Sequence, residues 1–232
     1  MQSTTPKNPR AKRTEQPTPT GFEFGSVVSY PQRYNAWGDS RYRGNCDGRL
    51  VLNLIRRYAP RTVADPMQGS GTTRDVVAWL NKKRGGEQIR YWGGDLHEGF
   101  DLETTNLPSR YDLVWVHPPY WNIIRYSNDS RDLSTEQNYG KFVRRLRQCL
   151  VRCAQALTPN GRLAVLVGDV RRRGGYYSIV CDLLQMEPDL GDLRSILVKL
   201  QHNCTSDART YRLEDAPIRH EYCVVFKRSS RR

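Results

Sequence analysis

The sequence predicts an α/β protein with a mostly parallel, doubly wound sheet that carries an antiparallel strand near the C-terminus. From residue 48 to residue 200, short apolar segments of strand-like composition alternate with segments whose apolar residues recur at helical spacing. This alternation implies crossover connections between parallel strands. The last two predicted strands, at 193–200 and 221–226, have no helix between them, so we expect one of them to pair antiparallel at the end of the sheet.

The first half of the chain predicts two helices and two strands. Asp47 is suited to an N-cap, and the apolar residues of 49–57 form a helical stripe. A strand at 61–64 leads into a glycine-rich turn at 65–73, and a helix at 74–83 stops at Gly85 and Gly86. A second strand at 89–93 ends close to Asp95.

The second half continues the alternation. An apolar strand at 111–116 ends in the tetrapeptide 117–120, and a helix at 142–157 is closed by Pro159, Asn160 and Gly161. The remaining predicted elements are a strand at 162–167, a basic loop at 169–175, a helix at 176–186 and the two final strands.

The chain carries a large excess of positive charge. Its 232 residues include 37 Lys and Arg against 24 Asp and Glu, which gives a formal net charge of +13, and the pI is about 9.7. Most of this excess lies beyond residue 25, so we expect the folded part to bind a polyanion, namely nucleic acid, with DNA favoured. The mean hydropathy of −0.72 and the lack of an apolar run near the ~20 residues that span a bilayer argue against a membrane partner.

The composition predicts three regions. We expect a disordered basic tail at 1–25, one folded domain at 26–228 and a short basic tail at 229–232. The N-terminus lacks an apolar signal segment and the six Cys are scattered, so reduced core thiols and a cytoplasmic location are predicted, nucleoid-associated in a bacterium. Cys149 and Cys153 fall in the apolar pattern of a helix and no CxxC pair occurs, so no metal site is predicted.

Three motifs follow predicted strands. Residues 64–73, ADPMQGSGTT, connect a strand to a helix, where glycines let a ligand approach the backbone and the helix N-terminus offers unpaired N–H groups. Asp95 ends the next strand, where an acid binds ribose hydroxyls in doubly wound folds. Residues 116–121, VHPPYW, follow an apolar strand, and their two prolines leave a backbone carbonyl without an internal donor. Ligands of open α/β sheets bind at this edge.

Together these motifs resemble those of the amino-group DNA methyltransferases, which act on N6 of adenine or N4 of cytosine. DPMQGSGTT resembles that family's DPFxGSGTT cofactor loop, and HPPYW resembles its (D/N/S)PP(Y/F/W) catalytic motif. The resemblance extends from about Gly38 to Lys227, in the permuted order with the cofactor loop first. It implies a Rossmann-like class I methyltransferase fold and S-adenosylmethionine as cofactor. Met67 replaces the family's usual Phe, and His117 replaces its usual Asp, Asn or Ser.

The resemblance also assigns site residues. It implies a catalytic set of His117, Pro118, Pro119 and Tyr120. It implies a cofactor site with the ribose on Asp95, the methionine end near Asp65 and Gly69, and the adenine near Asp101; the full set is Asn45, Asp65, Pro66, Met67, Gly69, Gly71, Thr72, Asp95 and Asp101. Nucleic acid is expected to contact Arg125 and Tyr126, just after the tetrapeptide, and Arg171, Arg172 and Arg173 in the basic loop on the same sheet edge.

The expected chemistry is methylation of an exocyclic amino group. The enzyme must accept hydrogen bonds from both N–H bonds, and we expect the Pro118 carbonyl and a neutral ring nitrogen of His117 to do so. Tyr120 is expected to stack on the base, which must leave the duplex to reach the pocket. With an unperturbed His117, activity falls on the acid side of neutrality; burial moves the fall lower.

Other interpretations remain open at this point. A base amino methyltransferase acting on RNA has the same motifs, and a non-catalytic nucleic-acid-binding protein has the same fold. His117 as a strand-end cap and the basic loop as a solvated turn are the structural alternatives. Only residues 122–137 and 201–219 are long enough to contribute to target recognition, so a homodimer or a specificity partner is a further expectation.

Overall fold

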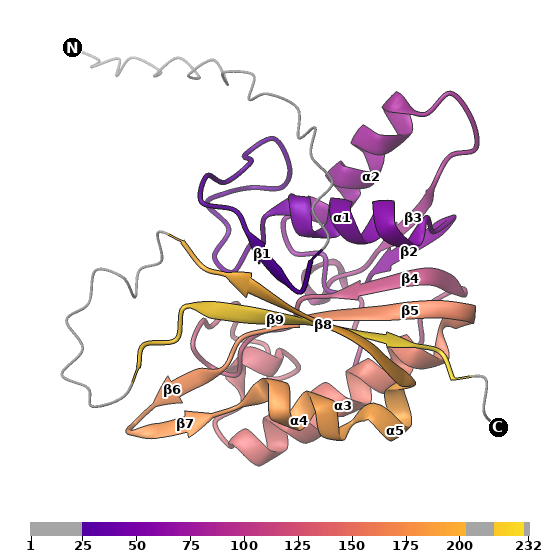
Figure 1. Cartoon of the computed structure of the whole chain (residues 1–232). Helices are drawn as coiled ribbons and strands as arrows, with labels where there is room; N and C mark the ends of the chain where they lie inside the picture. Colours follow the sequence, from indigo (N-terminus) through magenta and orange to yellow (C-terminus); the bar gives the residue numbers. More distant parts are fainter. Residues whose placement is uncertain (1–24, 203–215, 230–232) are drawn as a thin grey trace, which may run out of the picture.

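A central sheet with helices on both faces forms the body of the protein (Figure 1). The computed structural model describes residues 25–202 and 216–229. The predicted tails, 1–25 and 229–232, lie almost wholly outside the described residues, as does most of 201–219. The strands are β1 (Val27–Ser29), β2 (Thr62–Asp65), β3 (Arg90–Gly93), β4 (Tyr111–Val116), β5 (Leu157–Val167), β6 (Val170–Arg172), β7 (Gly175–Tyr177), β8 (Asp192–Leu200) and β9 (His220–Lys227).

The helices cover the sheet in two groups (Figure 1). The α-helices are α1 (Gly48–Tyr58), α2 (Thr72–Lys83), α3 (Tyr139–Gln155), α4 (Ile179–Gln185) and α5 (Glu187–Leu190). Two short 3-10 helices lie at Leu96–Glu98 and Leu133–Thr135. Helices α1 and α2 pack on one face, and α3, α4 and α5 pack on the other. None of the described helices is long and apolar enough to cross a membrane.

The sheet has the order β1-β8-β9-β5-β4-β2-β3. Strands β3, β2, β4 and β5 are parallel, and β9 is antiparallel to both β5 and β8, which confirms the predicted fold class. The expectation that the antiparallel strand ends the sheet is wrong, because β9 inserts between β5 and β8. The edge is instead β1, a three-residue strand that the sequence did not predict and that pairs in parallel with β8.

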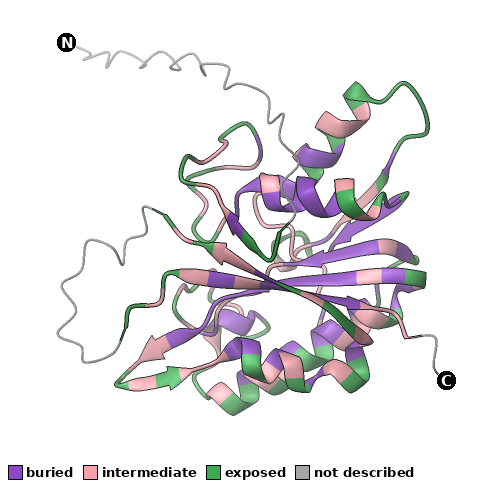
Figure 2. Ribbon diagram, in the orientation of Figure 1, coloured by how far each residue is buried: buried purple, intermediate pink, exposed green. Residues whose placement is uncertain are grey.

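The core is divided by the sheet, whose central strands are almost entirely buried (Figure 2). Successive residues of β4 alternate between faces: Leu113 packs on the side of α1 and α2, and Val114 packs on the side of α3. Strand β5 does the same with Ala164 and Val165. Burial on both faces explains the continuous apolar runs of these strands.

Two helix boundaries show what the local sequence determines. Asp47 caps α1 as predicted, since its side chain accepts from the Arg49 amide. The predicted helix 142–157 runs instead from Tyr139 to Gln155. It starts earlier because the Asn138 side chain caps it, accepting from the Lys141 amide, and it stops earlier because Leu157 already pairs with Tyr111 in the sheet.

The basic segment 169–175 is not a loop. Strands β6 and β7 form an antiparallel hairpin in which Val170 faces Tyr177 and Arg172 faces Gly175. The predicted helix 176–186 is correspondingly wrong at its start, and α4 begins at Ile179 behind the N-cap Ser178. Buried Asp169 joins the hairpin to α4, because its carboxylate accepts from the Tyr176 hydroxyl, the Ser178 hydroxyl and the Val180 amide.

Candidate functional site

A pocket opens at the carboxyl ends of β2, β3 and β4. It brings together most of the residues that the sequence analysis selected: Asn45, Asp65, Pro66, Met67, Gly69, Thr72, Asp95, Asp101, His117, Pro119 and Tyr126. Gly71, Pro118 and Tyr120 do not line it. The glycine-rich loop and the tetrapeptide therefore share one cavity, although 44 positions separate the end of the loop at Thr73 from the start of the tetrapeptide at His117.

The glycine-rich loop is held by two carboxylates. Buried Asp65 accepts from the Thr73 hydroxyl at 2.6 Å and from the Met67 amide at 3.3 Å. Burial raises the pKa of Asp65 to about 7, and these hydrogen bonds offset only part of that effect. Asp95 accepts from the Gly69 amide at 2.9 Å and so ties the loop to the end of β3. Gly69 has a φ of +48°, a conformation that favours glycine.

The wall beyond Asp95 combines apolar and acidic residues. Leu96, Phe100 and Leu102 line the pocket next to Asp95 and Asp101. The Asp101 carboxylate accepts from the Glu103 amide and the Thr104 hydroxyl, which fixes the turn that follows. An apolar surface beside carboxylate oxygens suits a flat ring attached to a polyol.

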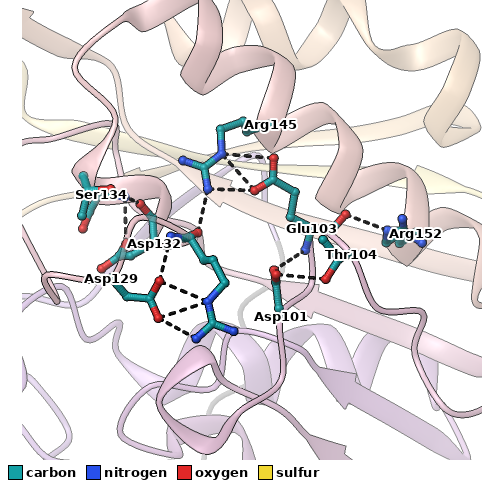
Figure 3. A network of polar contacts seen from close by, with 10 residues as sticks. Asp101, Glu103, Thr104, Asp129, Asp132, Ser134, Arg145 and Arg152 are labelled. Carbon is teal, nitrogen blue, oxygen red and sulfur yellow. Dashed lines mark hydrogen bonds and ion pairs between the residues drawn. The ribbon is translucent and has the colours of Figure 1, made fainter.

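A polar network closes this side of the pocket (Figure 3). Arg145 of α3 binds Glu103 at 2.7 Å and donates to the Arg131 carbonyl at 2.8 Å. Asp132, which also lines the pocket, accepts from the Ser134 amide and the Ser127 hydroxyl. The segment 122–137 is thereby fixed against the pocket.

The tetrapeptide forms the opposite wall and contains a chain of polar contacts. His117 Nε2 lies 3.0 Å from the Tyr120 hydroxyl, which donates to Glu221 Oε1 at 2.9 Å. Lys199 Nζ donates to Glu221 Oε2 at 2.5 Å. The chain links β4 to β8 and β9.

Burial sets the charge states along this chain. It lowers the pKa of His117 to about 4 and raises that of Tyr120, so both side chains are neutral near pH 7. Burial opposes the charge of Glu221 as well, but the Lys199 ammonium, His117 and the hydrogen bonds from Lys199 and Tyr120 together outweigh it, and the pKa of Glu221 is lowered. Glu221 and Lys199 therefore form a buried ion pair.

The backbone around the tetrapeptide is also defined. Pro118 is buried, and no hydrogen bond within the described part of the chain ends on its carbonyl oxygen. Trp121, the residue that follows the tetrapeptide, has a φ of +52°, which is uncommon for a bulky side chain. Its indole donates to the Glu136 carbonyl at 2.8 Å, and the Arg172 guanidinium lies 5.6 Å from its ring.

Gly168 makes room for the Tyr120 ring. A Cβ atom on Gly168 would lie 2.7 Å from Tyr120 Cε2, closer than such atoms approach. We expect Gly168→Ala to destabilise the protein by about 1–3 kcal/mol, as overpacking does. Urea unfolding measures this change. Gly85→Ala is the matched control, because a Cβ there meets nothing within 4 Å, and an equal loss in both variants would contradict the assignment.

No family profile and no curated protein sequence matches the chain. Among solved structures, a Listeria monocytogenes protein described as a class I S-adenosylmethionine-dependent methyltransferase superposes with a TM-score of 0.51 at 14% identity. The match covers 79% of this chain and 59% of that one. The chain has the class I methyltransferase fold.

Two proteins of Thermus thermophilus align less closely. One, described as a DNA modification methylase and complexed with S-adenosylmethionine, has a TM-score of 0.37 at 23% identity, over 55% of this chain and 51% of that one. The other, TrmN, has a TM-score of 0.47 at 18% identity, over 81% of this chain and 51% of that one. The chain thus spans about half the length of these two proteins, and their superpositions add nothing to the fold assignment.

In this class I methyltransferase fold, the residues selected for nucleic acid fall into two groups. Tyr126 lines the pocket and stacks on Tyr42, with ring centroids 5.9 Å apart. Arg125 is exposed beside it, and its guanidinium donates to the Ser127 carbonyl. The hairpin β6–β7 follows β5, which is parallel to β4, so it lies at the sheet edge that carries the tetrapeptide (Figure 1).

The three arginines of the hairpin differ in their contacts. Arg171 donates to the Ala216 carbonyl and lies over the Tyr176 ring. Arg172 packs on Trp121 and donates to the Asn122 carbonyl at 3.4 Å. Arg173 is exposed at the turn. The structure therefore leaves Arg173 more accessible to a phosphate than Arg172.

The class I methyltransferase fold also brings in residues that the sequence analysis did not select. Tyr42 and Ser70 line the pocket, Glu221 of β9 contacts the tetrapeptide, and Lys199 of β8 binds Glu221. A charged residue within an otherwise buried strand is a usable signal for Glu221. Lys199 has no such signal, because it can be identified as the partner of Glu221 only from the register of the antiparallel strands β8 and β9.

Proposed function

We propose that this chain is an S-adenosylmethionine-dependent methyltransferase that modifies an exocyclic amino group of a nucleic-acid base. The proposed substrate is N6 of adenine or N4 of cytosine in DNA. The observation that carries the proposal is that the glycine-rich loop, Asp95 and the tetrapeptide residue His117 line one pocket at the carboxyl edge of the sheet.

The pocket fits S-adenosylmethionine. The buried Ser70 hydroxyl lies in the loop and has no partner within the described part of the chain, so a polar group of the ligand would satisfy it. Asp95 would accept from the ribose hydroxyls, and Leu96, Phe100 and Leu102 would contact the adenine. Asn45 and Asp65 would hold the methionine end. The cofactor would supply a methyl group on a sulfonium, an excellent leaving group.

The protein's own part in the reaction would be to orient the amino group. The Pro118 carbonyl and a neutral His117 would accept its two N–H bonds, which favours a pyramidal nitrogen with an available lone pair. Tyr120 does not line the pocket, since its ring packs on Gly168 and its hydroxyl binds Glu221, so the flipped base would stack on Tyr126, which does line it. Positioning of this kind is worth several kcal/mol.

Methyl incorporation tests the proposal. Purified protein with S-adenosylmethionine labelled in the methyl group is offered duplex DNA, single-stranded DNA and structured RNA, and the modified base is identified by mass spectrometry of nucleosides. We expect label on N6-methyladenine or N4-methylcytosine from DNA. Label in RNA alone would transfer the proposal to an RNA substrate, and no label with any substrate would leave a nucleic-acid-binding protein.

We expect the affinity for DNA to depend steeply on salt. If about six phosphates are contacted, log K against log salt should have a slope of about −5. Replacing Arg171, Arg172 and Arg173 by Ala should reduce that slope by up to about 3, and Arg173→Ala alone by about 1. Fluorescence anisotropy over a salt series measures it.

The matched control for the hairpin is Arg84→Ala. Arg84 is exposed at the end of α2, at the amino ends of the strands and therefore away from the pocket. The substitution removes one arginine charge there. The slope of this variant should equal that of the wild type. Equal slopes for the wild type and the triple variant would instead place the DNA away from the hairpin.

A further inference from the structure

The side chains of Lys199, Glu221 and Tyr120 each have a defined charge. Lys199 and Glu221 form an ion pair at 2.5 Å, with side-chain exposures of only 12 and 10%. An ionised carboxylate accepts hydrogen bonds and donates none. Tyr120 has a single hydroxyl proton, and its oxygen lies 2.9 Å from Glu221 Oε1.

These charges fix the direction of each hydrogen bond that joins His117, Tyr120 and Glu221. If Tyr120 donated to His117, its oxygen and that of Glu221 would face each other at 2.9 Å with no proton between them. The Tyr120 proton therefore points to Glu221. Its oxygen is left to accept, and the donor 3.0 Å away is His117 Nε2.

The other ring nitrogen of His117 then carries a lone pair. A neutral imidazole holds one proton, so a proton on Nε2 leaves Nδ1 as an acceptor. No hydrogen bond within the described part of the chain involves Nδ1, and it is not among the buried polar atoms that lack a partner. Nδ1 is thus the ring nitrogen left for a ligand, in a side chain that lines the pocket.

We propose that Glu221 and Lys199 are positioning residues that set the tautomer of His117 through Tyr120, so that Nδ1 is presented to the pocket as a hydrogen-bond acceptor. The inference rests on the proposed function for its purpose, since an amino group needs an acceptor there. Its physical content, the protonation pattern of one ring, stands apart from any substrate. A histidine at this position then supplies the acceptor that a carboxylate or amide oxygen would otherwise supply.

The variant Glu221→Gln reverses the expected pattern. Lys199 has only donors, so it takes the amide oxygen, and the amide NH2 group turns to Tyr120. The Tyr120 oxygen then accepts from Gln, its proton points to His117 Nε2, and the ring proton moves to Nδ1. The acceptor that faces the pocket is lost without a change in side-chain size.

Nitrogen-15 NMR of the full-length protein, labelled at histidine, reads the tautomer directly. The chain has four His, and His117→Asn identifies the signals of interest. We expect a pyrrole-type shift at Nε2 and a pyridine-type shift at Nδ1 in the wild type, and the exchanged pattern in Glu221→Gln. Tyr120→Phe, which keeps the ring but removes the hydroxyl, should give a mixture of tautomers.

Single-turnover methyl transfer provides the second measurement. Glu221→Gln should slow it by about 10²–10³-fold, the effect of losing one preorganised polar group, with unchanged affinity for S-adenosylmethionine. Glu87→Gln, the same chemical change at an exposed ion pair, should leave both the tautomer and the rate unchanged. A wild-type or Glu221→Gln ring with the opposite pattern to that expected overturns the inference. Absence of methyl transfer in the wild type overturns the proposed function instead, and the NMR result still decides the tautomer.

Discussion

His117→Ala is expected to lose roughly 2–4 kcal/mol of transition-state stabilisation, about 30- to 800-fold in rate. The side chain lines the pocket, and its neutral ring offers the acceptor that the amino group needs. His117→Asn should retain substantial activity, because an amide oxygen also accepts. Single-turnover methyl transfer against pH measures all three proteins. A rate for the Ala variant equal to that of the wild type would reduce His117 to a structural cap.

The pH profile separates the two active forms. Burial lowers the pKa of His117 to about 4, so the ring is neutral and accepts at every pH well above 4. Protonation removes the acceptor, and wild-type activity should therefore fall only as the pH falls through about 4. His117→Asn should lack this acid limb. The sequence alone placed the fall near neutrality for an unperturbed ring, and the burial found in the structure moves it down.

Asp65→Ala should abolish binding of S-adenosylmethionine. The carboxylate lines the pocket and also holds Thr73 and the Met67 amide, so its loss removes a ligand contact and loosens the glycine-rich loop. Hydrogen bonds to charged groups contribute about 1.5–3 kcal/mol each, so losing one lowers the affinity by about 10- to 150-fold, and the loosened loop lowers it further. Isothermal titration calorimetry measures it. Retained binding at the wild-type affinity would contradict the cofactor assignment.

Asp65→Asn separates binding from stability. The pKa of Asp65 is raised to about 7 by burial, so its protonated form is favoured in the folded protein and wild-type stability declines as the pH rises from about 4 through 7. The Asn variant has no such decline and should be more stable than the wild type at pH 8, while binding the cofactor weakly. Asp192→Asn, at the start of β8 in the half of the sheet away from β2, should change neither property.

The parts of the site that the sequence predicted are those contained in continuous segments. The loop 65–73 and the tetrapeptide 117–120 each follow a strand, and parallel strands bring their carboxyl ends to one edge. Glu221 was out of reach because its contact with Tyr120 depends on β9 entering the sheet between β5 and β8. A local pattern carries no information on that insertion.

The hairpin β6–β7 was missed for a different reason. Gly174 and Gly175 have low strand propensity, and Tyr176 and Tyr177 precede an apolar helical pattern. What decides the structure is Asp169, which binds Tyr176 and caps the start of α4 from outside the hairpin. A hydrogen bond between a buried carboxylate and an amide eleven residues later cannot be predicted from the periodicity of apolar residues.

The insertion of β9 has a consequence for how the protein comes together during synthesis. Strand β9, the last that the structure describes, pairs with β5 on one side and with β8 on the other, and β8 pairs with β1. Until residues 220–227 are available, β5 and β8 present unpaired edges, the kind of surface on which chains aggregate. The ion pair behind the tetrapeptide forms at the same step, because Glu221 lies on this strand. A nascent chain could thus complete the glycine-rich loop early, whereas the polarised His117 would arise only with the closing strand.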